Sequence, residues 1–311
     1  MTKYIIKKLV IAVVTLFLVV FILFLLMELM PGSPFNDPKL SDDQKQVMMQ
    51  AYGLDKPVLT RFFIYVKNIF HGDFGVSYNL ATDVPVAELI KTRLPISMII
   101  GAAALVLGSI AGLVLGFFAA FKKGKIWDLI CRIISVISIS VPAYIFAILF
   151  SYYLGFRLKA LPLLYDFRSP VLSSLMAVVS LSIFVMGVVM RYTRDESITV
   201  LNSDYVLFAR SQGISKSTLL FKYVMRNSFM PIITVITMLL VGLLTGSMVT
   251  ESIFAVPGIG FLLSSAVSAN DYNVVIALSF VFALIYVIAR LVLDILYGII
   301  DPRVRVSGRA N

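Results

Sequence analysis

The sequence contains very little of the chemistry from which most catalytic and metal sites are built. Among its 311 residues there is one cysteine, Cys131, and one histidine, His71. One cysteine excludes an internal disulfide, and one histidine argues against the usual histidine-rich metal sites and proton relays. We therefore predict no metal site on this chain.

Nucleotide-binding and hydrolase motifs are missing as well. The sequence has no GxxxxGK[ST] and no GxSxG, and a HExxH motif would need a second histidine. Without a glycine loop that presents backbone amides to phosphates, the chain is not expected to hydrolyse ATP unaided. We predict no catalytic residues and no cofactor bound to this chain.

Charged residues are scarce as well. Only 14% of the residues are charged, while 59% are hydrophobic, and the mean hydropathy is +0.96. Soluble domains normally carry about 25% charged residues. The composition therefore predicts a membrane protein, most of whose surface lies in the lipid bilayer. Nucleic-acid binding is not needed to explain the net charge of +10, since the basic residues follow a membrane topology.

Long uncharged runs are what the sequence has in abundance. A spanning helix rises 1.5 Å per residue through about 30 Å of hydrocarbon, so it needs about 20 apolar residues. Six segments satisfy or nearly satisfy this condition, and the first is too long for a signal-peptide core. We predict an all-α polytopic membrane protein with six transmembrane helices. They are expected within 1–30 and at about 96–121, 133–156, 171–190, 231–250 and 274–300.

The basic residues predict the orientation of these helices. If the N-terminus is cytoplasmic, residues 1–8, 122–132, 191–230 and the tail 301–311 place sixteen of the 27 basic residues on one side. The short outer loops 157–170 and 251–273 hold three and none. The positive-inside rule therefore predicts that both termini are cytoplasmic. Residues 31–93 become an extracytoplasmic helical segment between the first two spans, and residues 191–230 become a cytoplasmic loop.

Small residues spaced by four predict where helices pack closely inside lipid. The second span carries Gly108, Gly112 and Gly116, and the fifth carries Gly242 and Gly246. Static helix packing is favoured here over a sliding surface of a gate. In the last span, Arg290 and Asp294 are four residues apart, which favours a structural ion pair over a substrate contact. Pro142 is expected to kink the third span.

The loop 191–230 contains a helix, glycine, helix pattern around Gly213. On the first helix, Tyr205, Phe208, Ala209 and Gln212 have the spacing of one helical face. Either Ser215 or Ser217 can cap the second helix, whose apolar residues include Leu220. Such a hairpin could lie along lipid headgroups. The break at Gly213 favours docking into a shaped protein partner instead.

The same stretch resembles the so-called EAA loop of permease subunits of binding-protein-dependent ABC importers. Ala209, Gly213, Asn227 and Pro231 match its recurrent positions. Further segments resemble the dipeptide and oligopeptide permease B branch of that family, although Ser33 stands where the family often has aspartate. These segments are MPGSP, YGLDKPVLTRF, HGDFGVSY, PVAELIKTRLP, SISVPAY, TESIFAVPGIG, NDYNVV and IIDPRVR.

The resemblance implies a type I importer (MetI-like) permease core at 94–300 in a bacterial cytoplasmic membrane. It implies a homologous second permease subunit, two cytoplasmic ATPases that bind ATP and Mg, and an extracytoplasmic binding protein that delivers the peptide. It also implies that the EAA hairpin sits in a groove on one ATPase. The coupling residues expected from the match are Asp204, Tyr205, Phe208, Ala209, Gln212, Gly213, Ser215, Leu220 and Asn227.

Three questions stay open at this point. Glu251 with Pro257, Gly258 and Gly260 is either an outer gate or a simple turn between the last two spans. The cargo is either a peptide or another solute, such as a nickel chelate. A membrane scaffold or sensor that recruits a cytoplasmic protein without moving solute is the alternative from another class.

Overall fold

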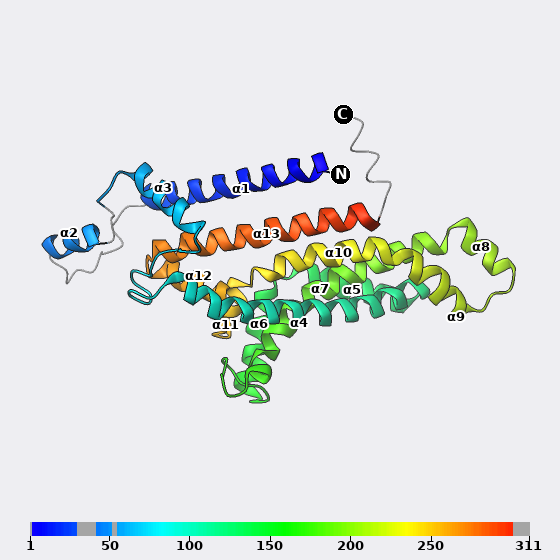
Figure 1. Ribbon diagram of the computed structural model, residues 1–311. Coiled ribbons are helices and arrows are strands. Elements are labelled where there is room, and N and C mark those ends of the chain that lie inside the picture. The colour runs from blue at the N-terminus through cyan, green and yellow to red at the C-terminus, as the bar shows by residue number, and fades with distance from the viewer. Residues whose placement is uncertain (1, 30–41, 52–54, 301–311) are drawn as a thin grey trace. The chain divides into compact units, whose positions relative to one another are not determined.

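The computed structural model describes residues 2–29, 42–51 and 55–300, and within these ranges nearly all regular structure is helical (Figure 1). The described residues also contain an isolated antiparallel β-bridge between Val76 and Pro85. The chain divides into two compact units, Met1–Ile96 with Gly258–Asn311, and Ser97–Pro257. The expected all-α architecture is confirmed. The tail 301–311 lies outside the described residues.

The first unit is built on a long helix at each end of the chain. Its elements are α1 (Thr2–Leu29), α2 (Asp42–Ala51), α3 (Val58–Ile69), α12 (Ile259–Ser268), α13 (Tyr272–Ile300) and the start of α4. α1 packs against α13 and α3. Phe62 of α3 is buried among the rings of Phe17, Phe21 and Phe24 of α1. A second core joins Val86 and Ile90 of α4 to α12 and α13.

The second unit is centred on α7 (Pro170–Leu201), which contacts α5 (Ile126–Ser140), α6 (Ala143–Phe150) and α10 (Arg226–Leu244). α4 (Val86–Phe121) continues into this unit, and its Leu105 and Phe117 share a core with Val185, Val189 and Ile232. Short elements complete it: η1 (Ser151–Arg157), α8 (Asp204–Ser211), α9 (Lys216–Thr218), η2 (Leu219–Met225) and α11 (Met248–Ile253). η1 and η2 are π-helical turns.

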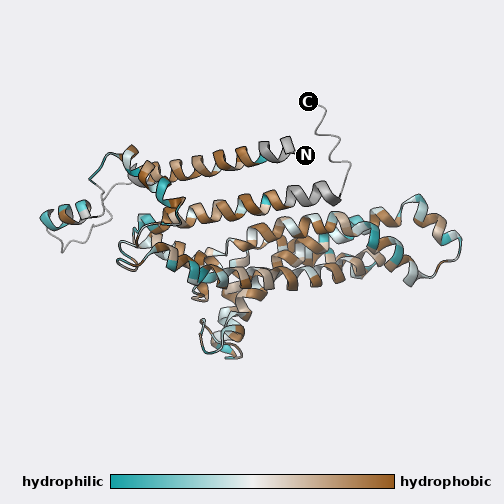
Figure 2. Cartoon of the chain, viewed as in Figure 1, coloured by the Kyte–Doolittle hydropathy of each residue, from teal (hydrophilic) through white to brown (hydrophobic). Residues whose placement is uncertain are grey.

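Five described helices are long and apolar enough to cross a membrane, and a bent pair brings the number to six (Figure 2). The bent pair is α5 with α6 and η1, whose axes differ by 96°. The sequence predicted one kinked span at 133–156, whereas the helix stops at Ser140 and restarts at Ala143. Proline removes a backbone donor and disfavours the helical conformation of the residue before it. Val141, which precedes Pro142, is accordingly extended with φ −88° and ψ 120°.

Several helix boundaries also differ from those predicted. α4 begins at Val86 rather than near 96, and α7 continues past Arg191 to Leu201. Uncharged runs locate only the part of a helix that hydrocarbon can hold, and a helix can continue beyond it. α10 ends at Leu244 rather than at 250, because the chain turns at Gly246 with φ +75°.

Candidate functional site

The helix, glycine, helix pattern predicted around Gly213 is present as a hairpin, defined here as residues 203–227. Gly213 has φ +77°, a conformation that favours glycine. Its amide donates to the carbonyl of Arg210 at 3.0 Å, and the Ile214 amide donates to the carbonyl of Ala209 at 3.4 Å. These two bonds form a Schellman motif, which satisfies carbonyls at the end of α8 and reverses the chain.

Two polar side chains shape the second half of the hairpin. Ser215 Oγ accepts from the Thr218 amide at 3.3 Å, so Ser215 rather than Ser217 is the cap of this helix. The helical run then continues from Lys216 through η2 into α10 without a break. Asn227 Nδ2 donates to the Tyr223 carbonyl at 2.7 Å. The second arm of the hairpin is therefore the first part of the helix that enters the apolar region.

One side of the hairpin is packed against the ends of two long helices. Val206 and Ala209 of α8 and Leu219 and Val224 of η2 are buried. They form one cluster with Ala120 at the end of α4 and with Val200 and Leu201 at the end of α7. The hairpin is therefore in contact with the ends of both α4 and α7.

Three aromatic residues of the hairpin are exposed in the described chain. Phe208 is 65% exposed and Phe221 is 64% exposed, and Tyr205 and Gln212 are exposed beside them. Asp204 lies in the first turn of α8, where an acidic residue complements the helix dipole.

Of the four residues predicted to share one face of α8, Tyr205, Phe208 and Gln212 are exposed, whereas Ala209 is buried. Ala209 points into the cluster with α4 and α7, because Val206 and Ala209 are three apart and together form the inner face of α8. Leu220 is half-buried against the core that contains Phe117 and Val189.

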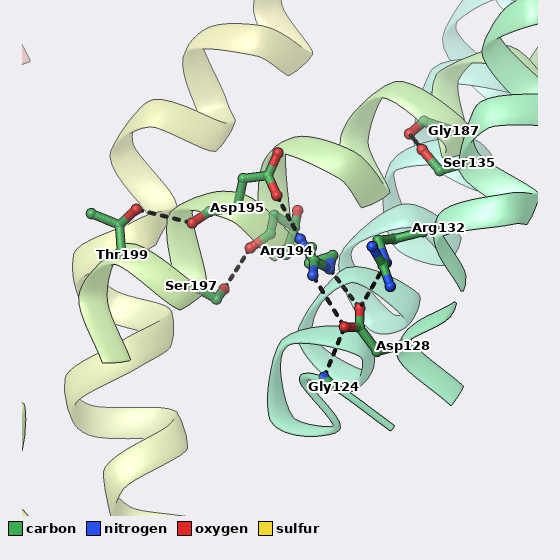
Figure 3. Close-up of polar contacts among 10 residues, drawn as sticks. Gly124, Asp128, Arg132, Ser135, Gly187, Arg194, Asp195, Ser197 and Thr199 are labelled. Carbon is green, nitrogen blue, oxygen red and sulfur yellow. Dashed lines mark hydrogen bonds and ion pairs between the residues drawn. The ribbon is translucent and has the colours of Figure 1, made fainter. Parts of the chain in front are cut away.

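A buried ion pair lies next to this hairpin, between α5 and α7 (Figure 3). Asp128 in the first turn of α5 is 1% exposed. Its Oδ1 accepts from Nε of Arg194 on α7 at 2.6 Å, and its Oδ2 accepts from Nη2 of the same guanidinium at 3.1 Å. The Gly124 amide donates to Oδ2 at 3.0 Å, and Arg132 Nε lies 3.8 Å from Oδ1. Arg194 Nη1 also donates to Asp195 at 2.9 Å.

The sequence analysis missed Asp128, since its partner is 66 residues away. One signal could have found it: it is an isolated acid at the start of an apolar helix, where an acid needs a partner. No group of three or more His, Cys, Asp or Glu side chains in the described part could hold a metal ion.

The glycine stripe on α4 lies directly against α7. A Cβ added at Gly108 would lie 2.5 Å from the Ser182 carbonyl oxygen, and one at Gly112 or Gly116 would lie 2.8 Å from the carbonyl oxygen of Met186 or Met190. The backbones of α4 and α7 therefore approach too closely for any side chain at these positions.

The pair Gly242 and Gly246 does not form the second stripe that was expected. Around Gly242 there is no described atom within 4 Å of an added Cβ. Gly246 lies beyond the end of α10, where its Cβ would meet Glu251 Oε1 at 2.6 Å. The uncharged run 231–250 suggested one helix, but the positive φ of Gly246 ends it.

Glu251 is buried in α11 at 2% exposure, and its Oε1 accepts from Ser97 Oγ at 2.7 Å. Pro257 closes the second unit, while Gly258 and Gly260 belong to the first unit at the start of α12. Glu251 therefore anchors the turn after α10 to α4 within its own unit. An outer gate formed by these four residues stays a prediction.

Of the predicted ion pair between Arg290 and Asp294, only the side chain of Arg290 is described. Arg290 is exposed on α13. The side chain of Asp294 lies outside the described residues, so the ion pair also stays a prediction.

In the first unit, Asp271 is a polar centre that the sequence analysis did not identify. It is fully buried, and its Oδ2 accepts from Ser77 Oγ at 2.5 Å and from the amides of Asn79 and Leu80 at 3.1 Å each. Asn273 Nδ2 adds a bond to the Val76 carbonyl at 2.8 Å. One carboxylate therefore holds the loop 76–80 against the start of α13.

Comparison with known proteins agrees with this architecture. Residues 112–306 match the family described as "Binding-protein-dependent transport system inner membrane component", and residues 1–101 match "Binding-prot-dependent transport system membrane comp, N-term". The chain belongs to this family of binding-protein-dependent transport membrane components.

Individual relatives match over nearly the whole chain. The Dipeptide transport system permease protein DppB of Lactococcus lactis subsp. cremoris is 42% identical over 98% of this chain and 100% of the relative. DppB of Bacillus subtilis is 32% identical over 98% of both chains. The Oligopeptide transport system permease protein OppB of Haemophilus influenzae is 33% identical over 98% of this chain and all of that protein.

A solved structure shares the fold. It is described as the crystal structure of an amino acid ABC transporter with histidines, and it superposes with a TM-score of 0.53 at 16% identity. The superposition covers 70% of this chain and 94% of that chain.

Proposed function

We propose that this chain forms half of a path by which dipeptides or oligopeptides enter a bacterial cell, driven by two separate ATPase subunits. A homologous permease forms the other half, and an extracytoplasmic binding protein delivers the peptide. Peptide cargo is supported by the printed names of the relatives, which are dipeptide and oligopeptide transport permeases.

One structural observation supports a role of the hairpin in coupling to the ATPases. The hairpin buries one face against the ends of α4 and α7 and leaves the aromatic side chains of Phe208 and Phe221 exposed. Exposed aromatic residues at the tip of a membrane protein are typical of a protein interface, because they bury large apolar area with little loss of conformational entropy. In this proposal the ATPases bind ATP and Mg, and the hairpin receives their movement.

Phe208→Ala is expected to weaken the association with the ATPases without affecting membrane insertion. Loss of a buried interface aromatic costs about 2 kcal/mol, or roughly thirtyfold in Kd. The measurement is ATPase recovered when the full complex is purified through a tag on this chain. Phe167→Ala, which changes an aromatic residue that is 75% exposed in a predicted outer loop, is the matched control.

Equal recovery from the Phe208 and Phe167 variants would remove the docking role of Phe208. Recovery of a single regulatory protein, without ATPases or a second permease, would favour a membrane scaffold or sensor instead. Peptide uptake in cells that depend on this chain, compared with uptake of a nickel chelate, identifies the cargo.

We also propose that both termini and the hairpin are cytoplasmic. Cys131 is buried, so a Cys131→Ala background is suited to single-cysteine labelling. A membrane-impermeant maleimide added to intact cells is expected to label a Thr82→Cys variant and to spare a Ser211→Cys variant. Inside-out vesicles should show the reverse, and labelling of the Ser211 variant from outside would overturn the orientation.

A further inference from the structure

The ion pair of Asp128 with Arg194 has a position that the docking role of the hairpin does not explain. Arg194 lies seven residues before Leu201, the end of α7 on which the hairpin packs. Seven residues are two helical turns, or about 10 Å. The guanidinium therefore stands two turns from the place where movement of the hairpin reaches α7.

The contacts of Asp128 make a directional link between α5 and α7. Both carboxylate oxygens bind the same guanidinium, at 2.6 Å and 3.1 Å, in a bidentate arrangement that fixes the relative orientation of the two groups. The Gly124 amide holds the carboxylate from the α4–α5 turn. Well-packed apolar residues can stabilise a buried site as much as an ion pair does, so the presence of this pair is not explained by stability alone.

Beyond the ion pair, toward the C-terminal end of α5, α5 and α7 stay in contact. Ser135 Oγ donates to the Gly187 carbonyl at 2.8 Å. A Cβ added at Gly187 would lie 2.6 Å from Cβ of Ser138. α5 then ends at Ser140, and the chain bends by 96° at Val141 and Pro142. The contact of α5 with α7 that includes Asp128 therefore extends to within one turn of the helix break.

We propose that Asp128 and Arg194 are positioning residues that make α5 move together with α7 when the hairpin is displaced. The displacement then reaches the bend at Val141 and Pro142 instead of being lost by slippage between α5 and α7. This inference rests on the proposed function, because it needs an ATPase that moves the hairpin. Neither residue is a docking residue, since the carboxylate is buried and bound to α7.

The test measures ATP hydrolysed per peptide imported by the full complex reconstituted with its binding protein. Asp128→Asn keeps the shape of the side chain but removes the charge, and Arg194→Lys keeps the charge but loses the bidentate fork. Both are expected to raise ATP use per peptide by about fivefold or more, the size of a modest coupling between sites. Asp195→Asn is the matched control, because it removes an exposed carboxylate from the same guanidinium and should change the ratio by less than about twofold.

A role limited to stability would lower the thermal midpoint and the yield of all functions together, without changing ATP use per peptide. We therefore expect ATPase recovery equal to wild type for both variants. The double variant should raise the ratio no further than either single variant, since the two residues act through one contact. If Asp128→Asn behaves like Asp195→Asn in a complex that still binds its ATPases, the inference fails and the proposed function stands. If the wild-type chain binds no ATPase, the proposed function fails first.

A distance measurement on the otherwise unchanged complex tests whether α5 and α7 move together, even if Asp128→Asn does not fold. Spin labels at Lys125 and Thr199, two exposed positions beside the ion pair, report the separation of α5 and α7 in a Cys131→Ala background. We expect the same label distance in the nucleotide-free complex and in the ATP-trapped complex. A change of more than about 5 Å, roughly one helical turn, would show that the helices slide past each other and would overturn the inference.

Discussion

Gly108→Ala is expected to destabilise the folded chain by about 3 kcal/mol, a large effect for one methyl group. The added Cβ would lie 2.5 Å from the Ser182 carbonyl oxygen and 2.6 Å from Cβ of Val185. Both atoms belong to α7, and a backbone oxygen cannot rotate away as a flexible side chain can. α4 and α7 must therefore separate, which also opens the core of Leu105, Phe117 and Val189. The measurement is the thermal midpoint of the purified protein in detergent.

Gly242→Ala provides a matched control for this result. It is also a helical glycine, on α10, but no described atom lies within 4 Å of the added Cβ. Alanine favours the helical conformation over glycine by about 1 kcal/mol, so this variant should be neutral or more stable. A loss of stability of similar size in both variants would mean that the close contact of α4 with α7 is not the cause.

Gly213→Val is expected to reduce peptide uptake by about tenfold or more, because the reversal of the hairpin requires φ +77°. A β-branched residue in this conformation is strained by about 2 kcal/mol, which corresponds to roughly thirtyfold in the population of the native turn. There is no steric clash to add, since no described atom lies within 4 Å of the new Cβ. The expected loss therefore comes from a changed direction of α8, with membrane insertion intact and ATPase association weakened.

Gly72→Val separates backbone strain from the role of the hairpin. Gly72 has φ +76° and equally open surroundings, but it lies in the turn after α3. The two variants carry the same strain, so only the Gly213 variant should lose uptake and ATPase association together. Normal uptake by the Gly213 variant would contradict the proposed coupling role.

The number of spans was predictable because hydrocarbon thickness sets a minimum apolar length. The direction of each span was not, as the third one shows. Residues 133–156 are uncharged throughout, yet Pro142 and the extended Val141 divide them into two helices that diverge by 96°. Hydropathy records whether a segment tolerates lipid, whereas direction depends on backbone dihedral angles at one or two residues.

For the candidate site, local patterns were informative and distant contacts were not. Gly213 and a serine cap were predictable because both depend on residues within one turn of the chain. The inward placement of Ala209 depended on where the ends of α4 and α7 lie, and the importance of Asp128 depended on an arginine of another helix. A repeat of four marked Gly108 as a packing position, but the same repeat at Gly246 marked only a turn.

The continuous helical run from Lys216 to Leu244 joins the second arm of the hairpin directly to α10. Its 29 residues form a helical segment about 40 Å long, since each α-helical residue adds 1.5 Å and the seven π-helical residues of η2 add somewhat less. A tilt of about 10° around the end near Leu244 would carry the end near Lys216 through about 7 Å. If the hairpin receives the movement of the ATPases as proposed, a displacement of a few ångströms near Lys216 would correspond to a rotation of only a few degrees at the end near Leu244.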